Sequence, residues 1–125
     1  MFKPKASFSG LSAKDLPAVK EFYANTLGLT VDDGQMGLHV HLPHGAELFI
    51  YEGDHKPAEY TCLDFVVDDI DEAVDALTRQ GVTFERYEGY NQDEKGIARG
   101  KSQNMGPDIA WFKDPAGHIL AVLES

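Results

Sequence analysis

The sequence predicts an α+β fold in which a βαβββ unit occurs twice, and three observations support this prediction. Two amphipathic segments, near residues 15–28 and 69–81, have helical spacing, and each follows a strand-like run. Each ends at a glycine, and turn residues then separate further strand-like runs. The spacing from capping aspartate to closing glycine is nearly the same in the two halves. We expect the paired units to form a curved mixed sheet around a cavity, with the helices outside.

In the first half, a strand is predicted over residues 7–13. Asp15 can cap the following helix, Pro17 suits its first turn, and Gly28 stands where a helix commonly ends. Three short strands are predicted next, over 29–31, 37–42 and 47–51.

In the second half, the pattern restarts with a strand over residues 60–67, and Asp68 or Asp69 caps a helix that ends at Gly81. A strand is predicted over 82–87. The loop 88–107 is long enough to be a lid or binding loop in which Arg99 or Lys101 meets an anionic group, or else a mobile solvated loop. A β-hairpin over 108–124 closes the sheet around the turn Asp114-Pro115-Ala116-Gly117.

With 125 residues the chain is long enough for one domain, residues 1–125. The first module is expected at about residues 5–52 and the second at about 60–125. The polar, proline-containing segment 53–59 is predicted to link them.

The charge and cysteine content exclude several classes of function. Acidic residues number 21 against 11 basic ones, and a formal net charge of -10 repels nucleic acid and anionic membranes. A single cysteine, Cys62, excludes an intrachain disulfide framework and suits a reducing cytosol. The apolar runs are strand-sized and the first ten residues lack the apolar core of a signal peptide, so we expect a cytoplasmic protein.

Two stretches of sequence carry a family resemblance. FYANTLGL at 22–29 and FKDPAGHIL at 112–120 resemble the vicinal oxygen chelate superfamily, which includes glyoxalase I, extradiol dioxygenases, fosfomycin-inactivating enzymes and bleomycin resistance proteins. The resemblance spans about residues 7–124 and implies paired βαβββ modules and a homodimer. It leaves the reaction open, since this scaffold hosts several chemistries and some plain binders.

The resemblance also identifies the positions at which the superfamily holds a divalent metal with His and Glu side chains. In this sequence three of them fall on Phe8, Cys62 and Ala121, which cannot form a stable divalent site. The fourth position does not align to one residue, because Glu47, Phe49 and Tyr51 all share the inward parity there. The sequence therefore predicts no metal and no cofactor.

Aromatic side chains occupy the strand positions where the superfamily has its metal. An apolar ligand pocket or a filled core would both use such residues. The residues concerned are the aromatic Phe8, Phe49, Tyr51 and Trp111, together with the apolar Ile119 and Ala121.

A few polar strand residues are further site candidates. His39 and His41 point to one face of a strand, either toward the cavity as a proton-transfer or metal pair, or outward. Asp64, on the same face as Cys62 by parity, is a candidate general base or amine ligand, or else pairs with an arginine or solvent. Cys62 itself has no recognisable activating partner and is expected to be a small buried residue.

Three hypotheses follow. The leading one is a metal-independent, glyoxalase- or bleomycin-resistance-like homodimer that binds a small, partly aromatic molecule, and either sequesters it or acts on it with Asp64, Glu47 or the histidine pair. The alternative is a metal-dependent lyase or dioxygenase-like enzyme with a rearranged site that uses His39 or His41. The third is a scaffold whose cavity is closed by its own aromatic side chains.

Overall fold

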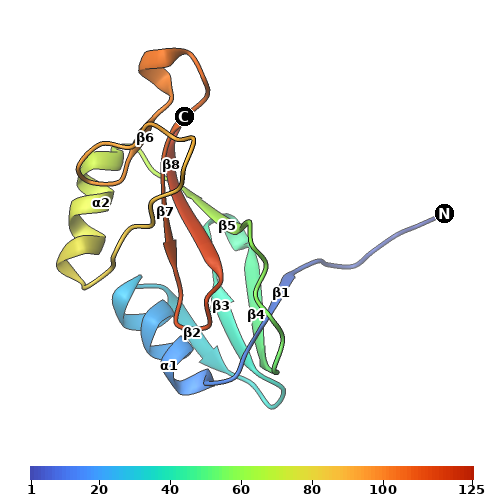
Figure 1. Cartoon of the computed structure of the whole chain (residues 1–125). Helices are drawn as coiled ribbons and strands as arrows, with labels where there is room; N and C mark the ends of the chain where they lie inside the picture. Colours follow the sequence, from blue (N-terminus) through green and yellow to red (C-terminus); the bar gives the residue numbers. More distant parts are fainter. The chain divides into compact units, whose positions relative to one another are not determined.

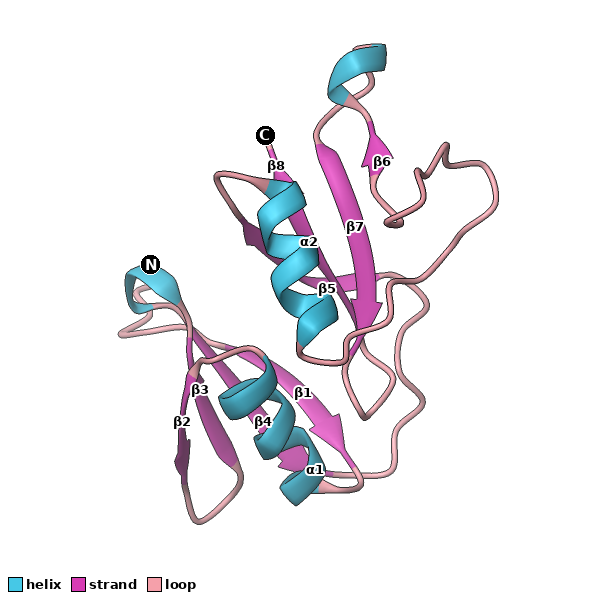
Figure 2. Ribbon diagram, turned by 90° about the vertical axis from the view of Figure 1, so that its left-hand side faces the viewer, coloured by secondary structure: helices cyan, strands magenta, loops and turns pink.

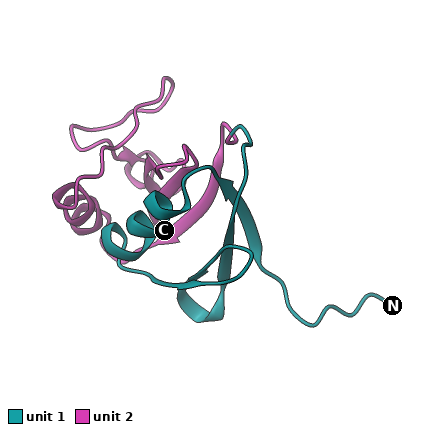
Figure 3. Ribbon diagram, turned by 90° about the horizontal axis from the view of Figure 1, so that it is seen from below, with its two compact units in different colours: residues 1–56 teal, residues 57–125 magenta.

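Each half of the chain folds into its own four-stranded mixed sheet with a helix against one face (Figures 1 and 2). The structure is a computed structural model that describes residues 1–125 and divides into two compact units, residues 1–56 and 57–125 (Figure 3). Both units run in the order strand, helix, three strands, which confirms the predicted α+β fold of two βαβββ modules. The eight strands form two separate sheets that do not close into one.

In the first unit the strand order is β1-β4-β3-β2. β1 runs parallel to β4, and the other neighbours are antiparallel. The elements are β1 (Ser9–Ala13), α1 (Leu16–Glu21), the π-helical turn η1 (Phe22–Thr26), β2 (Thr30–Asp33), β3 (Leu38–His41), the 3₁₀ turn η2 (Pro43–Gly45) and β4 (Glu47–Glu52).

The start and end of the first helix follow the sequence prediction. The Asp15 carboxylate accepts a hydrogen bond from the Ala18 N–H at 3.1 Å, and Pro17 lies in the first turn. After η1 the chain turns at Gly28, whose φ of 72° is in the left-handed region that favours glycine. Val19 and Tyr23 are the buried residues of this helical segment.

In the second unit the strand order is β5-β8-β7-β6, again with the first strand parallel to its neighbour. The helix α2 begins after Asp69, whose carboxylate accepts from the Glu72 N–H at 3.1 Å, and it buries Ile70 and Val74. The elements are β5 (Thr61–Val66), α2 (Ile70–Arg79), β6 (Ala98–Arg99), the 3₁₀ turn η3 (Lys101–Gln103), β7 (Asp108–Lys113) and β8 (Ile119–Glu124).

The closing hairpin has the predicted turn. Asp114 is only 5% exposed, and one of its carboxylate oxygens accepts from both the Ala116 and the His118 N–H groups, at 2.9 and 3.0 Å. The backbone closes the turn as well, since the N–H of Asp114 donates to the carbonyl of His118. The turn thereby fixes the register in which Trp111 of β7 lies opposite Ala121 of β8.

The prediction of a strand over residues 82–87 is wrong, because this segment is not a strand in the structure. This segment makes one backbone hydrogen bond to the sheet, from the Glu85 N–H to the Trp111 carbonyl at 2.8 Å. The Gln92 side chain takes the place of a strand partner, because its amide donates to the carbonyls of Glu85 and Gly96 and accepts from the Tyr87 N–H. The second strand of this module is instead β6, which lies inside the predicted loop and pairs with β7.

The loop 88–107 is thus partly structured and is tied to the helix of its own unit. Arg99 donates two hydrogen bonds to the Asp71 carboxylate on α2, at 2.8 and 3.1 Å. Arg99 therefore pairs with acidic groups of the protein itself, and the prediction that it meets an anionic ligand stays untested.

No helix in the chain is both long and apolar enough to cross a membrane.

Candidate functional site

The predicted site residues of the second unit lie in one row across its sheet. Asp64 of β5 pairs in register with Ala121 of β8, and Ala121 pairs with Trp111 of β7. Directly opposite residues share a face of a sheet, so these three side chains lie on the same face. Trp111 is 8% exposed and Ala121 is fully buried, whereas Asp64 is exposed.

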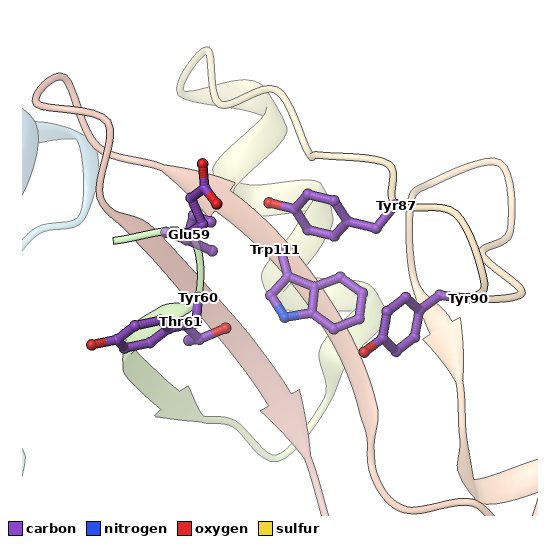
Figure 4. A pocket seen from close by; sticks show the side chains of 7 residues that line it. Glu59, Tyr60, Thr61, Tyr87, Tyr90 and Trp111 are labelled. Atoms are coloured by element: carbon purple, nitrogen blue, oxygen red, sulfur yellow. The ribbon is translucent and has the colours of Figure 1, made fainter. Parts of the chain in front are cut away.

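Two tyrosines surround Trp111. The Tyr87 ring meets the indole edge-on, with centroids 5.5 Å apart, and the Tyr90 ring is tilted against it at 4.8 Å. Figure 4 shows both rings beside the indole, on the segment that follows α2. Such contacts are worth about 0.5–1.5 kcal/mol beyond the area they bury.

These rings form one wall of a pocket in the second unit, with a volume of about 270 Å³. Residues 59–61, at and just before the start of β5, lie on the other side of the indole, as Figure 4 shows. The lining residues are Glu59, Tyr60, Thr61, Tyr87, Tyr90, Trp111 and Ile119. The pocket is therefore mainly aromatic, with one carboxylate among its lining groups.

Of the lining residues, the sequence analysis selected Trp111 and Ile119. Tyr87 was assigned to the end of a strand that does not form, and Tyr90 to the long loop. The feature of the sequence that could have indicated these tyrosines was the length of that loop, which is typical of a binding loop. The contact between Tyr90 and the indole depends on how the loop folds back on β7, which a local pattern does not encode.

The hydroxyl of Tyr87 is buried and has no hydrogen-bond partner. Burial, and secondarily the negative charge of Glu85, raises the pKa of Tyr87 above its ordinary value. The group therefore stays protonated and remains a hydrogen-bond donor at neutral pH.

Cys62 lies at a β-bulge, which changes its predicted relation to Asp64. Thr61 pairs with Ile119 and Leu63 pairs with Leu120, so Cys62 is an extra residue on β5. The parity count that placed Cys62 and Asp64 on one face does not hold across a bulge. The Cys62 thiol lies 3.4 Å from the Ile119 carbonyl, and burial, with the charge of Asp114 adding to it, raises the pKa of the thiol. A raised pKa disfavours the thiolate that a nucleophile or metal ligand requires.

The Asp64 carboxyl is the one ionisable group in the row with Trp111. Although the side chain is exposed, desolvation by the surrounding protein raises its pKa, in the direction that a general base near neutral pH requires. No hydrogen bond or ion pair connects it to a base or acid partner, so its catalytic role stays a prediction.

The remaining predicted ligand-binding residues lie together on the sheet of the first unit. Phe49 of β4 is paired in register with His39 of β3, and the two rings are 5.1 Å apart. Tyr51 stacks on Phe49 at 6.1 Å, and Phe8 meets Phe49 edge-on at the same distance. Phe8 is 67% exposed and Tyr51 is 39% exposed, so this aromatic row is open rather than a filled core.

The two histidines of β3 are each bound to a carboxylate. His39 Nδ1 lies 2.9 Å from Glu47 Oε1, and His41 Nε2 lies 2.7 Å from Asp32 Oδ2. The half-buried Glu47, a candidate catalytic residue, is thus engaged with His39. The pairs are separate, and no three His, Cys, Asp or Glu side chains converge in a way that could hold a metal ion.

The donor set at the metal positions that the resemblance implies does not fit a divalent ion. Phe8 and Ala121 offer no lone pair, and Cys62 has a raised thiol pKa. No step of a mechanism is therefore assigned to a metal.

Solved structures of other proteins have a fold similar to that of this chain. A glyoxalase family protein from Enterococcus faecalis is 25% identical, with a TM-score of 0.69, over 99% of this chain and 100% of its own. The oxidase ChaP-H2 is 24% identical, with a TM-score of 0.68, over 98% and 95%. The fosfomycin resistance protein FosX from Listeria monocytogenes is 18% identical, with a TM-score of 0.70, over 99% and 95%.

No curated protein matches this sequence. The family model of the Glyoxalase/Bleomycin resistance protein/Dioxygenase superfamily matches residues 7–122, which is nearly the whole chain. Together with the two βαβββ modules, this match shows that the chain belongs to the Glyoxalase/Bleomycin resistance protein/Dioxygenase superfamily.

Proposed function

We propose that this protein binds a small, partly aromatic molecule in the pocket around Trp111 and does so without the metal that many members of its superfamily use. The observation that carries the proposal is the pair of tyrosine rings against the indole, which leaves an aromatic wall open to a pocket of about 270 Å³. Ligand pockets are commonly lined by aromatic side chains with a few polar groups that fix orientation, and this volume suits a small ligand.

The charge of the protein further restricts the class of ligand that the pocket favours. Glu59 lines the pocket, Asp64 lies in the same row as Trp111, and the net charge of the chain is -10. A neutral or cationic ligand is therefore favoured over an anionic one. Sequestration of the ligand needs no more than this pocket, whereas turnover would require a base such as Asp64 of the same unit to act on the bound molecule.

The competing hypothesis is a metal-dependent enzyme with a rearranged site that uses His39 or His41. In its favour, both imidazoles lie on one face of β3. Such a site would need His39 or His41 to exchange its carboxylate partner for the metal, and to find a third ligand.

Quinoline, a flat and neutral bicyclic probe, tests the proposed function. Trp111 is the single tryptophan of the chain, so its indole N–H gives one identifiable NMR cross-peak in the pocket. We expect quinoline to shift this peak in a saturable way. Replacing the 56% exposed Tyr90 by leucine should weaken binding roughly 2- to 10-fold, because one ring contact is lost.

The matched control is Phe2→Leu, which removes an aromatic ring that is 88% exposed and lies outside the pocket. It should leave quinoline binding unchanged. Elemental analysis of protein purified without a tag runs beside the titration. Near-stoichiometric metal that is lost on replacing His39 and His41 would favour the metal-dependent alternative. A Trp111 cross-peak that no flat aromatic probe shifts would contradict binding at this pocket.

A further inference from the structure

The Tyr87 hydroxyl is the one buried side-chain polar group of the chain that lacks a hydrogen-bond partner, and Tyr87 lines the pocket. A buried donor without a partner is destabilising, so buried polar groups almost always have one. An exception in a pocket wall indicates that the partner comes from what the pocket binds.

The hydroxyl cannot easily find a partner by moving, because Tyr87 is held at both ends. Its backbone N–H donates to the Gln92 side chain at 2.8 Å, and its ring packs against the Trp111 indole at 5.5 Å. Gln92 is itself fixed by its two bonds to the carbonyls of Glu85 and Gly96. The donor therefore has a set position beside the aromatic wall, as Figure 4 shows.

The protonation state of the hydroxyl defines which ligand group it can meet. With its pKa raised, Tyr87 offers a proton and is not a phenolate. A ligand group that meets it must accept a hydrogen bond. The net charge of -10 on the chain opposes an anionic acceptor, which leaves a neutral one.

We propose that the pocket selects a planar aromatic ligand that carries a neutral hydrogen-bond acceptor on its edge, such as a ring nitrogen or a carbonyl oxygen. The acceptor receives the hydrogen bond of the Tyr87 hydroxyl while the ring of the ligand contacts Trp111. This inference rests on the proposed function and adds the specificity-determining residue and the chemical feature that it reads.

Quinoline and naphthalene form a ligand pair that tests the inference, since they have nearly the same shape and only quinoline has a ring nitrogen. Affinities for both are measured from the Trp111 indole N–H cross-peak in the wild type and in Tyr87→Phe, which keeps the ring and removes only the hydroxyl. We expect the quinoline-to-naphthalene affinity ratio to fall roughly 5-fold in the variant. Comparing ratios cancels the difference in hydration between the two ligands.

Thr30→Val is the control, because it removes an exposed hydroxyl on β2 of the first unit, outside the pocket. Its affinity ratio should equal that of the wild type. Without ligand, Tyr87→Phe should leave the midpoint of thermal unfolding unchanged or raise it, because the hydroxyl has no protein partner to lose.

The possible results separate the inference from the proposed function. If both ligands bind and the ratio is the same in the wild type and Tyr87→Phe, the inference is overturned while the pocket remains an aromatic site. A lowered unfolding midpoint for Tyr87→Phe also overturns it, since the hydroxyl would then have a partner in the free protein. If neither ligand shifts the Trp111 peak, the proposed function itself fails.

Discussion

Among single residues, Asp114 shows how one side chain can define a turn. Its carboxylate accepts two backbone hydrogen bonds inside the turn between β7 and β8, while the side chain is almost completely buried. The backbone donors of Ala116 and His118 depend on it, because a turn of this length offers them few other acceptors. The register of Trp111 against Ala121 follows from this turn.

We predict that Asp114→Ala lowers the free energy of unfolding by about 1–3 kcal/mol, since two backbone donors lose a charged acceptor in a buried turn. Urea unfolding followed by circular dichroism measures this change. Asp54→Ala is the control, because its ion pair with Lys14 joins side chains that are 80% and 73% exposed and should contribute little. Equal effects of the two substitutions would contradict the role of the Asp114 turn.

The individual site residues differ in how far the sequence predicts them. Trp111 and Ala121 follow from strand parity, because a two-residue period defines which side chains share a face. Cys62 and Asp64 show the limit of the same count, since a bulge in β5 shifts the parity between them. Tyr87 and Tyr90 meet the indole through the path of a loop, which parity does not describe.

Among the elements, the segment between α2 and β7 departs most from the sequence prediction. The sequence indicates a strand over 82–87 because Val82 and Phe84 alternate with polar residues. In the structure, the Gln92 amide satisfies the backbone of this segment instead, and β6 takes the edge of the sheet. Side-chain contacts within this segment thus outweigh a local strand preference.

Charged groups attach this segment to α2. Arg99 pairs with Asp71 of α2 and also with Asp93 and Asp108, while Lys95 pairs with Asp71 and Asp75. The hydrogen bonds from Arg99 lower the pKa of Asp71 below its ordinary value. The segment that carries Tyr90 is therefore held by electrostatics as well as by ring packing.

We predict that Arg99→Met loosens this segment, seen as faster amide hydrogen exchange in residues 88–107. The stability difference between wild type and variant should also depend on pH. Because pairing lowers the folded-state pKa of Asp71, its stabilisation is complete above the unfolded-state pKa of about 3.9 and is lost as the pH falls through the lower folded-state value.

Unfolding in urea at neutral pH and at successively lower pH measures this difference. The two proteins should converge in stability at low pH. Lys14→Met, which removes the exposed cation paired with Asp54, serves as the control and should change neither exchange in the loop nor the pH profile. A constant stability difference at all pH values would show that Arg99 acts through packing alone.

For the whole molecule, the duplication is the feature that the sequence predicts best. The capping aspartates and closing glycines mark the same element in both halves, and both halves do fold as βαβββ modules with four-stranded sheets. Capping and turn residues act locally, so the pattern that they form can be recognised although the two modules share little sequence identity.

The predicted homodimer is the remaining expectation at this scale, and exposed apolar side chains support it. β5 is an edge strand of its sheet, and its Val66 is 70% exposed. Tyr60, directly before this strand, is 72% exposed. Edge strands and exposed apolar side chains are common features of protein interfaces.

We predict that the protein sediments as a dimer at micromolar concentration and that Val66→Asp weakens the dimer roughly tenfold or more, because a charge would be buried at an apolar contact. Met105→Asp, at an apolar residue that is 77% exposed in the loop, adds the same charge to the chain and should leave the dimer intact. Sedimentation velocity over a concentration series measures both. A monomer at every concentration would refute the dimer, and equal weakening by both substitutions would show that net charge, rather than the surface at β5, governs association.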